Sequence, residues 1–437
     1  MTLTNHRVRD PFRASYDDLI LEDRVHGSVY TDPEIFEDEM AKIFSTGWVY
    51  VGHESQVPQP GDYHSGYVGR QPVIMVRGDD GQVRIFMNRC AHRAAMLCQD
   101  AGSTRFFKCA YHGWSFSTEG QLVGVPYPKG YGDSFRKEDF GLTPVPRVDD
   151  YRGLVFASLA DHGISLDEHL GEPTKRQIDL FIDLSPEGQI DCKTAGTARF
   201  TYRGNWKLQL ENTVDLYHIN FLHESLVDTL EKRQGVNIVA MSNDSSPARN
   251  VALGKGHTFW DIRPFNESNP ALREQVLQGR NPDEADYAKL MRERHGEERA
   301  KELLTIGGTH LAIFPNAGLL SGVIRQFRPI DVDFTEVILT PAMLVGVPDS
   351  MNTARLRAYE AFFPPAGMGG TDDQEIFERQ QMGLQAQVNP WLLVARGLDR
   401  EETRSDGTVS SQATDETNTR AIFRHWKSLM QADEEIT

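Results

Sequence analysis

The sequence predicts an α+β protein in which a small antiparallel β domain precedes a larger domain of mixed helices and strands. Its 437 residues are enough for two or three separate cores. Between about residue 45 and residue 158, short β-rich runs alternate with Gly and Asp-Gly turns, a pattern typical of antiparallel strands. After residue 158, helical patterns are mixed with strand-like runs, which favours one larger α+β domain.

We therefore expect three parts along the chain. Residues 1–44 form a helical lead-in that packs on the larger domain, because the apolar residues of segment 33–44 repeat near the helical period. Residues 45–158 form the β domain, and residues 159–437 form the larger domain. Residues 240–300 are polar and rich in charge, so we expect an insertion that serves as a lid or a partner surface.

Composition excludes several classes of protein. The 46 basic and 63 acidic residues give a net charge of −17, which argues against nucleic-acid and anionic-membrane partners and is compatible with a basic protein partner. The amino terminus lacks the apolar core of a secretion signal, and no run approaches a membrane span. Four cysteines are too few for a disulfide framework, so we expect a cytoplasmic protein in which Cys98 and Cys192 are ordinary thiols.

Two pairs of metal-ligand residues lie in "NRCAHRAAMLCQDAGSTRFFKCAYHGWSF", residues 88–116. Cys90 and His92 form one pair, and Cys109 and His112 form the other, so each pair supplies two ligands from one turn. Zinc accepts such a Cys₂His₂ set tetrahedrally. A [2Fe–2S] cluster accepts it with both cysteines on one iron and both histidines on the other. Because each pair mixes one Cys with one His, the cluster is the favoured interpretation.

A second candidate metal site lies in "GNWKLQLENTVDLYHINFLHES", residues 204–225. Asp215 and His218 are three residues apart and are expected to share a helix face. His223 follows five residues later, so we expect the helix to bulge or end between the two histidines. Two imidazoles and one carboxylate make the facial triad of non-haem Fe(II) oxygenases. Histidines that simply pack in a core are the competing interpretation.

Both segments resemble one family. "C-A-H-R-A…C-A-Y-H-G-W" resembles the Rieske fingerprint C-x-H-R-G…C-x-x-H-G-W, with Ala94 where the family usually has Gly. If that position needs a positive φ, Ala94 is strained. The second segment resembles the signature of the large (α) subunit of Rieske-type aromatic ring-hydroxylating oxygenases, in the benzoate, anthranilate and terephthalate branch. It matches at Asn205, Trp206, Lys207, Glu211, Asn212, Asp215, Tyr217, His218 and His223.

The resemblance covers nearly the whole chain and implies a role for each candidate residue. It implies a Rieske [2Fe–2S] domain, with the four Cys and His residues of segment 88–116 as cluster ligands, followed by a catalytic domain of helix-grip type. It implies Fe(II) bound by His218, His223 and an aspartate, for which we choose Asp373 over Asp372. Without the family, Thr371 and Gln374 in "TDDQ" favour a helix capping box instead. Asp215 becomes the acid that bridges a cluster histidine and an iron histidine of neighbouring subunits.

The resemblance also implies the reaction and the partners. The chain is expected to activate O₂ and to hydroxylate, as a rule cis-dihydroxylate, the ring of an aromatic carboxylate. No dinucleotide-binding motif is present in the sequence, so electrons are expected from a separate NAD(P)H reductase, directly or through a ferredoxin. The expected assembly is a homotrimer, with or without a small β subunit. Arg199 and Arg203 lie near the motif and are candidates for binding an acid substrate.

The side chains that line the substrate pocket are predicted to be Leu208, Asn212, Val214, Leu216, Phe221, Leu222 and Phe362, with a contribution from Phe363. Three alternatives remain open. The first is a Rieske monooxygenase that demethylates a quaternary amine or a methoxy-aromatic substrate. The second is a zinc-stapled binding module without catalysis, and the third is a simple electron carrier.

Overall fold

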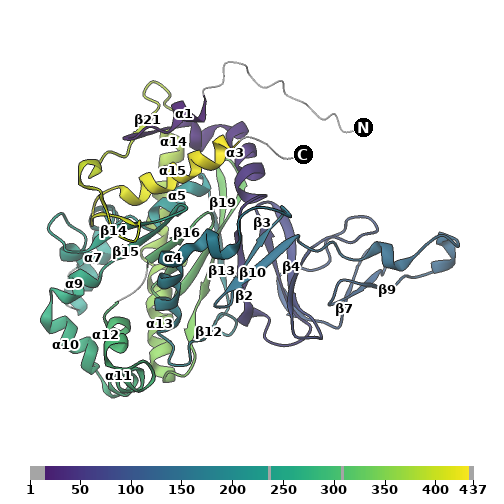
Figure 1. Ribbon diagram of the computed structural model, residues 1–437, viewed down its shortest axis with the longest axis horizontal. Coiled ribbons are helices and arrows are strands. Elements are labelled where there is room, and N and C mark those ends of the chain that lie inside the picture. Colours follow the sequence, from purple (N-terminus) through teal and green to yellow (C-terminus); the bar gives the residue numbers. More distant parts are fainter. Residues whose placement is uncertain (1–14, 235–237, 307–309, 433–437) are drawn as a thin grey trace.

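The computed structural model describes residues 15–234, 238–306 and 310–432. It has helices and antiparallel sheets in two lobes, so the predicted α+β fold class is confirmed. In Figure 1 the larger lobe carries most of the helices, and a smaller β lobe projects from its side.

The lead-in consists of short helices that contact the larger lobe. Its elements are α1 (Tyr16–Leu19), β1 (Arg24–His26), α2 (Ser28–Thr31), α3 (Pro33–Glu39) and the π-helix η1 (Met40–Phe44). Strand β1 pairs with the distant strand β21 (Trp391–Leu393). The fully buried Glu39 carboxylate accepts hydrogen bonds from Lys207 Nζ at 2.5 Å, Trp206 Nε1 at 2.8 Å and Trp426 Nε1 at 2.7 Å. One buried acid thus links the lead-in to two helices of the larger lobe.

The smaller lobe contains three antiparallel sheets. The first joins β2 (Val49–His53), β10 (Arg147–Tyr151) and β11 (Leu154–Ser158), and the second joins β3 (Asp62–Val68), β4 (Gln71–Arg77), β5 (Val83–Met87) and β6 (Ala101–Ser103). The third joins β7 (Phe106–Lys108), β8 (Ser115–Ser117) and β9 (Leu122–Gly124). Figure 1 shows this third sheet pointing away from the larger lobe.

A mixed-length antiparallel sheet forms the centre of the larger lobe. In the described residues it has the order β13-β19-β18-β17-β16-β15-β14-β23-β22. The bounds are β13 (Ala198–Tyr202), β14 (Arg249–Gly254), β15 (His257–Asp261), β16 (His310–Ile313), β17 (Ala317–Leu320), β18 (Val323–Asp331), β19 (Phe334–Pro341), β22 (Glu402–Thr403) and β23 (Val409–Gln412). A separate pair joins β12 (Ile190–Asp191) to β20 (Met343–Leu344).

Helices cover both faces of this sheet. The bounds are α4 (Leu166–Ile182), α5 (Trp206–Asn212), α6 (Ile219–Leu222), α7 (Glu224–Gln234), α8 (Ile238–Met241), α9 (Arg263–Glu267), α10 (Pro270–Gln278), α11 (Pro282–His295), α12 (Glu297–Thr305), α13 (Asp349–Phe362), α14 (Gly370–Gly383) and α15 (Thr417–Gln431). Alternate residues of β18 enter different cores: Val323 and Phe327 pack with Trp206 of α5, whereas Ile324 packs with Ile178 of α4. Residues with the same parity as Val323 therefore face α5.

The predicted insertion at 240–300 is wrong for residues 249–261. These residues form β14 and β15, which hydrogen-bond to β23 and β16 inside the large sheet and are mostly buried. The charged residues that motivated the prediction belong mainly to helices α9–α12, which lie on one side of the larger lobe (Figure 1). A lid or partner role for these helices stays a prediction.

Candidate metal centres and active site

The two loops that carry the Cys/His pairs have the same backbone pattern. Ala94 N donates to Cys90 O at 3.0 Å, and Gly113 N donates to Cys109 O at 2.9 Å. Each cysteine N–H then donates to the carbonyl five residues later. Both loops need a left-handed residue at the fourth position after cysteine: φ is 60° at Ala94 and 71° at Gly113. Ala94 is therefore strained, because its Cβ disfavours this conformation and Gly113 has none.

The four side chains of these loops converge with unsatisfied ligand atoms. Both cysteines are buried, and the rings of His92 and His112 lie 4.6 Å apart. Nδ1 of each ring is buried without a hydrogen-bond partner, which is costly unless a metal binds there. A set of two thiolates and two imidazoles is the ligand set of a Rieske-type [2Fe–2S] cluster, with both cysteines on one iron and both histidines on the other.

Trp114 lies beside the cluster loops. Its ring stacks on His92 with a centroid distance of 4.9 Å and is itself almost fully buried. Tyr111 is different, because it is 61% exposed and its ring centroid lies 3.8 Å from that of His112. The cluster histidines are thus covered on one side and reach the protein surface on the other.

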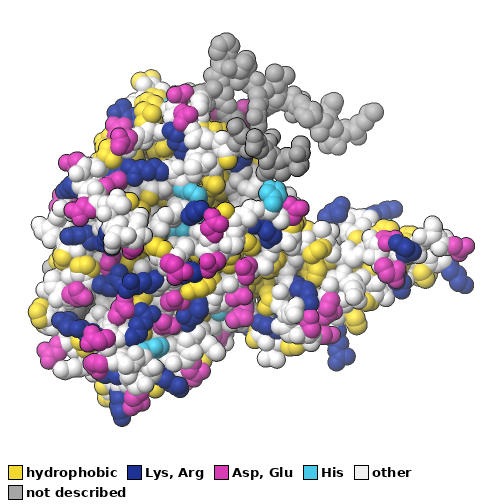
Figure 2. Space-filling model, viewed as in Figure 1, with side chains coloured by type: hydrophobic (Ala, Val, Ile, Leu, Met, Phe, Trp, Pro, Cys, Tyr) yellow, Lys and Arg dark blue, Asp and Glu magenta, His cyan; other side chains and the backbone are white. Residues whose placement is uncertain are grey.

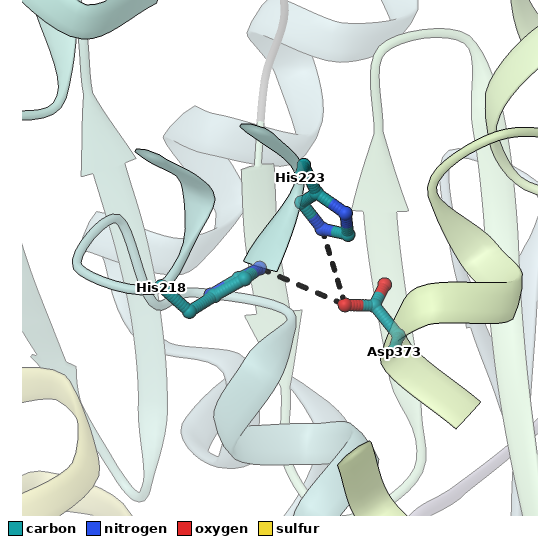
Figure 3. A group of neighbouring side chains, drawn as sticks. All are labelled: His218, His223 and Asp373. Carbon is teal, nitrogen blue, oxygen red and sulfur yellow. Dashed lines mark ion pairs between the residues drawn. The ribbon is translucent and has the colours of Figure 1, made fainter. Parts of the chain in front are cut away.

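His218, His223 and Asp373 meet in the larger lobe (Figure 3). One ligand atom from each lies within 4.8 Å of the others. Asp373 Oδ1 is 3.2 Å from His223 Nε2 and 3.7 Å from His218 Nε2. His223 Nε2 is buried and makes no hydrogen bond despite this proximity. Nitrogen and oxygen lone pairs that face a common point in this way suit a metal ion, and the donor set of two imidazoles and one carboxylate suits iron.

The segment between the two helices of this motif is not helical. Helix α5 ends at Asn212, residues 213–218 form turns, and the four-residue α6 ends just before His223. The predicted helix face shared by Asp215 and His218 is therefore wrong, whereas the predicted helix end before His223 is confirmed. The turn still brings Asp215 Oδ2 to 3.3 Å from His218 Nδ1.

The two neighbouring aspartates of α14 have different surroundings. Asp373 is 4% exposed, and Asn212 Nδ2 donates to its Oδ1 at 3.0 Å. Burial alone would raise the pKa of Asp373, but the nearby His223, His218 and Arg325 lower it overall. Asp372 Oδ2 instead lies 3.3 Å from Nδ1 of His223, on the outer side of that ring.

The capping box expected at Thr371 and Gln374 is absent. Gly369 is the N-cap of α14 and makes no side-chain cap, and Thr371 Oγ1 donates to Gly367 O from inside the first turn. The helix starts two residues earlier than a capping threonine at 371 requires, so the capping-box interpretation is wrong, although both acids do lie in the first turn.

A cavity of about 250 Å³ opens beside His218, His223 and Asp373. Of the predicted lining residues, Asn212, Phe362 and Phe363 are in its wall. The prediction is wrong for five others: Leu208, Val214, Phe221 and Leu222 line a separate groove next to Asp215, and Leu216 is fully buried in the core. The non-helical turn at 213–218 directs Val214 and Leu216 away from the cavity.

Comparisons with known proteins agree with this geometry. Residues 47–145 match the Rieske [2Fe–2S] domain, and residues 184–432 match the ring-hydroxylating α subunit (catalytic domain). The chain is 35% identical over 402 residues to the toluate 1,2-dioxygenase α subunit of Pseudomonas putida, covering 88% of this chain and 84% of the relative. It is 34% identical to the anthranilate 1,2-dioxygenase large subunit of Acinetobacter baylyi, covering 86% of this chain and 80% of the relative.

The chain belongs to the family of aromatic ring-hydroxylating dioxygenase α subunits. Its structure superposes on the naphthalene 1,2-dioxygenase of Rhodococcus sp. bound to indole with a TM-score of 0.80, 26% identity and coverage of 94% and 95% of the two chains. This α subunit is an oxidoreductase with a Rieske [2Fe–2S] cluster and a mononuclear iron site. The predicted family, cofactors and enzyme class are confirmed, and the zinc-module, carrier and demethylase alternatives are not favoured.

Members of this family are terminal oxygenases that take electrons from a separate reductase and act on an aromatic substrate, usually as multimers. Within the described residues, no helix combines the length and the apolar character needed to cross a lipid bilayer.

Sequence reasoning missed most of the cavity wall of this α subunit. The wall includes Thr213, Trp260, His310, Leu320, Ser321 and Arg325, which come chiefly from strands β15 to β18. The two arginines proposed from sequence lie elsewhere: Arg199 is 3.8 Å from Glu336, and Arg203 is exposed. The available signal was Arg325 itself, a charged residue among the apolar Val323, Ile324 and Phe327 of one strand.

Proposed function

We propose that this α subunit binds its cluster through Cys90, His92, Cys109 and His112, and that it cis-dihydroxylates a single-ring aromatic acid. The observation that carries the proposal is the placement of His218, His223 and Asp373, the proposed iron ligands, at the wall of a mostly apolar cavity. When bound, the iron supplies open coordination positions for O₂.

The residues around the proposed ligands hold them in place. Asp215 lies 3.3 Å from the outer nitrogen of His218, and Asp372 lies 3.3 Å from that of His223. Such outer carboxylates fix the tautomer and the orientation of a ligand imidazole. Asn212 fixes the third ligand, because its amide donates to Asp373 Oδ1. Phe362 and Phe363 close the apolar side of the cavity and help to exclude water from it.

The relatives and the cavity size indicate the substrate class. The most similar relatives include toluate, 2-halobenzoate and anthranilate dioxygenases. A cavity of about 250 Å³ is slightly smaller than the usual range of about 300 to 1,000 Å³ for small-ligand pockets, which favours one ring. The reaction balances as the aromatic ring plus O₂, two electrons and two protons giving a cis-diol.

We propose that the electrons cross between subunits of a homotrimer. Within one chain the β7–β9 sheet points away from the α5 region (Figure 1). The groove beside Asp215, with a volume of about 510 Å³, is lined by Asp215, Asp415 and Glu416, and by no Lys or Arg among the described residues. Glu211 also lines it, but burial raises its pKa to about 8, so this carboxyl adds no negative charge at neutral pH. The cluster loops and the β7–β9 sheet carry the exposed cations Arg93, Arg105 and Lys108. Figure 2 shows Lys and Arg side chains, together with Asp and Glu side chains, along the projecting lobe. The opposite charges support docking of the cluster loops of one subunit into the acidic groove of the next.

A mixed-subunit experiment tests the crossing. Chains with Cys109→Ser lack a cluster ligand, and chains with Asp373→Ala lack an iron ligand. If electrons cross between subunits, co-expressed mixed oligomers regain activity, although each parent alone is inactive. Mixed oligomers that stay inactive would show that each chain uses its own cluster.

The electron donor, the subunit composition and the localisation stay predictions. We expect a separate NAD(P)H reductase that acts directly or through a ferredoxin, a homotrimer with or without a small β subunit, and a cytoplasmic protein. The substrate proposal is tested by turnover of benzoate with ¹⁸O₂ and a reductase. A cis-diol with two labelled oxygens supports it. Phenolic product with one labelled oxygen would mean monooxygenation, and no attack on any single-ring aromatic would refute the proposal.

A further inference from the structure

Arg325 is a buried cation without an anionic partner. It lies on β18, where it has the same parity as Val323 and Phe327 and so faces α5, and it is 5% exposed. Its Nε is buried and has no hydrogen-bond partner. Its Nη1 lies 3.5 Å from Thr213 Oγ1, which is long for a hydrogen bond.

Another arginine of the same chain shows what a satisfied buried guanidinium looks like. Arg420 is 2% exposed, and its nitrogens donate to Glu401 Oε1 at 2.7 Å, Val394 O at 2.6 Å, Arg396 O at 2.8 Å and Thr417 Oγ1 at 2.9 Å. Arg325 forms no ion pair with any carboxylate that the structure describes within 4.0 Å. Burying a charge without partners is costly, so such a residue calls for an anion.

The position of Arg325 identifies where that anion binds. Arg325 lines the same cavity as His218, His223 and Asp373. Its guanidinium carbon lies 5.4 Å from the ring centroid of Phe363, so an aromatic wall adjoins the cation. Burial lowers the pKa of Arg325 to about 10, and it therefore remains charged at neutral pH.

We propose that Arg325 binds the carboxylate of the aromatic substrate and thereby selects acids over neutral rings. This inference rests on the proposed function, which it extends from a substrate class to a recognition residue. Thr213 Oγ1 lies beside the guanidinium, but its hydroxyl donates to Gln209 O at 2.7 Å, so the guanidinium itself supplies the hydrogen bonds to the carboxylate. The ring then lies between this end of the cavity and the metal-ligand side chains, with Phe362 and Phe363 at its faces. An unpaired arginine also disfavours a quaternary ammonium substrate by charge repulsion.

The competing role is structural, with Arg325 acting as the counter-charge of Asp373, whose carboxylate it stabilises at longer range. The two roles predict different behaviour of Arg325→Met. A buried, unpaired charge replaced by an apolar side chain of similar length leaves the fold intact, so the melting temperature of Arg325→Met matches or exceeds that of the wild type. A structural counter-charge predicts a lower melting temperature and loss of iron.

Calorimetric titration of the iron-loaded protein with benzoate and with benzamide, its uncharged analogue, is the test. The wild type is expected to bind benzoate at least about 30-fold more tightly than benzamide, since a desolvated charge pair contributes this much or more. Arg325→Met is expected to lose that factor for benzoate and to keep its benzamide affinity within about threefold. Arg328→Met is the matched control, because Arg328 is on the same strand but pairs with Glu336 at 3.2 Å, away from the cavity.

Each outcome decides the proposal. An unchanged benzoate affinity in Arg325→Met overturns the role of Arg325. A wild type that oxidises toluene but binds benzoate no better than benzamide also overturns this role, but it leaves the ring-hydroxylating function standing. A wild type that neither binds nor oxidises any single-ring aromatic overturns both proposals. If Arg325→Met fails to fold, two other measurements test the proposal. They are the ratio of the benzoate and benzamide affinities of the wild type, and the benzoate affinity of Arg325→Lys.

Discussion

Replacing Asp373 and Asp372 in turn by asparagine distinguishes an iron ligand from its neighbour. The two residues are adjacent on α14, have the same chemistry and differ in what they contact. Asp373 Oδ1 lies 3.2 Å from His223 Nε2 and 3.7 Å from His218 Nε2. Asp372 Oδ2 reaches the outer nitrogen of His223, and its side chain is 36% exposed. We expect Asp373→Asn to abolish iron binding, because an amide lacks the charge of the third ligand.

Asp372→Asn should have a smaller effect. Removal of an outer carboxylate typically weakens metal affinity about 10- to 100-fold, or about 1.4 to 2.7 kcal/mol. We expect the lower half of this range, because Asp372 is partly exposed and water replaces part of its contact. The metal-free protein of both variants should keep its melting temperature within a few degrees, since neither acid supports the core.

Competition with a ferrous chelator measures the affinity of the mononuclear site. The visible absorption of the Rieske cluster reports in the same sample whether the smaller lobe is intact. The assignment would be refuted if Asp373→Asn retained iron while Asp372→Asn lost it, or if both variants lost iron equally.

Three further predictions concern stability. Ala94→Gly should stabilise the cluster domain by about 1 kcal/mol by relieving the left-handed alanine, measured as a higher temperature for loss of cluster absorption; a lower temperature would contradict the strain. Burial, with the charges of nearby acids, raises the pKa of Glu211 from its ordinary 4.5 to about 8. The folded protein therefore holds a proton that the unfolded chain releases, and stability falls as pH rises from about 4.5 to 8. The melting temperature of Glu211→Gln should rise relative to that of the wild type as pH increases across that window, and the difference should level off above it. A melting-temperature difference that does not change with pH would count against the raised pKa of Glu211. Glu39→Ala leaves the buried Lys207 charge unpaired and should cost about 3 to 5 kcal/mol in urea unfolding, most of which Lys207→Met in the same chain should restore. An unchanged midpoint in Glu39→Ala would refute this.

Local spacing made the metal centres predictable. The Cys/His pairs lie on short loops, so two ligands of each pair are fixed by four or fewer residues of chain. The strain at Ala94 followed in the same way, because a turn of this length needs one left-handed residue. His223 could be placed beyond a helix end since a five-residue offset does not fit one helix face.

The rest of the site depends on pairing between strands that are distant in the sequence, and this could not be predicted from local patterns. Arg325 reaches the cavity only because β18 lies beside β17 and β19 in the large sheet, and no nearby sequence pattern encodes that register. The choice of Val214 and Leu216 as cavity-facing residues failed for a different reason. A continuous helix was assumed where the chain turns at 213–218, and a turn changes the direction of every side chain on it. Burial of β14 and β15 likewise depended on partners from distant strands.

A single-turnover experiment on the reduced protein examines both metal centres together. The protein is reduced with dithionite, freed of reductant and mixed with benzoate and ¹⁸O₂ in the absence of a reductase. We expect a cis-diol with two labelled oxygens, and for each product molecule the oxidation of one reduced cluster, the second electron coming from the mononuclear iron. Ring oxidation while the cluster stays reduced, or cluster oxidation by O₂ without any ring product, would contradict electron transfer from the Rieske centre to a ring-hydroxylating iron.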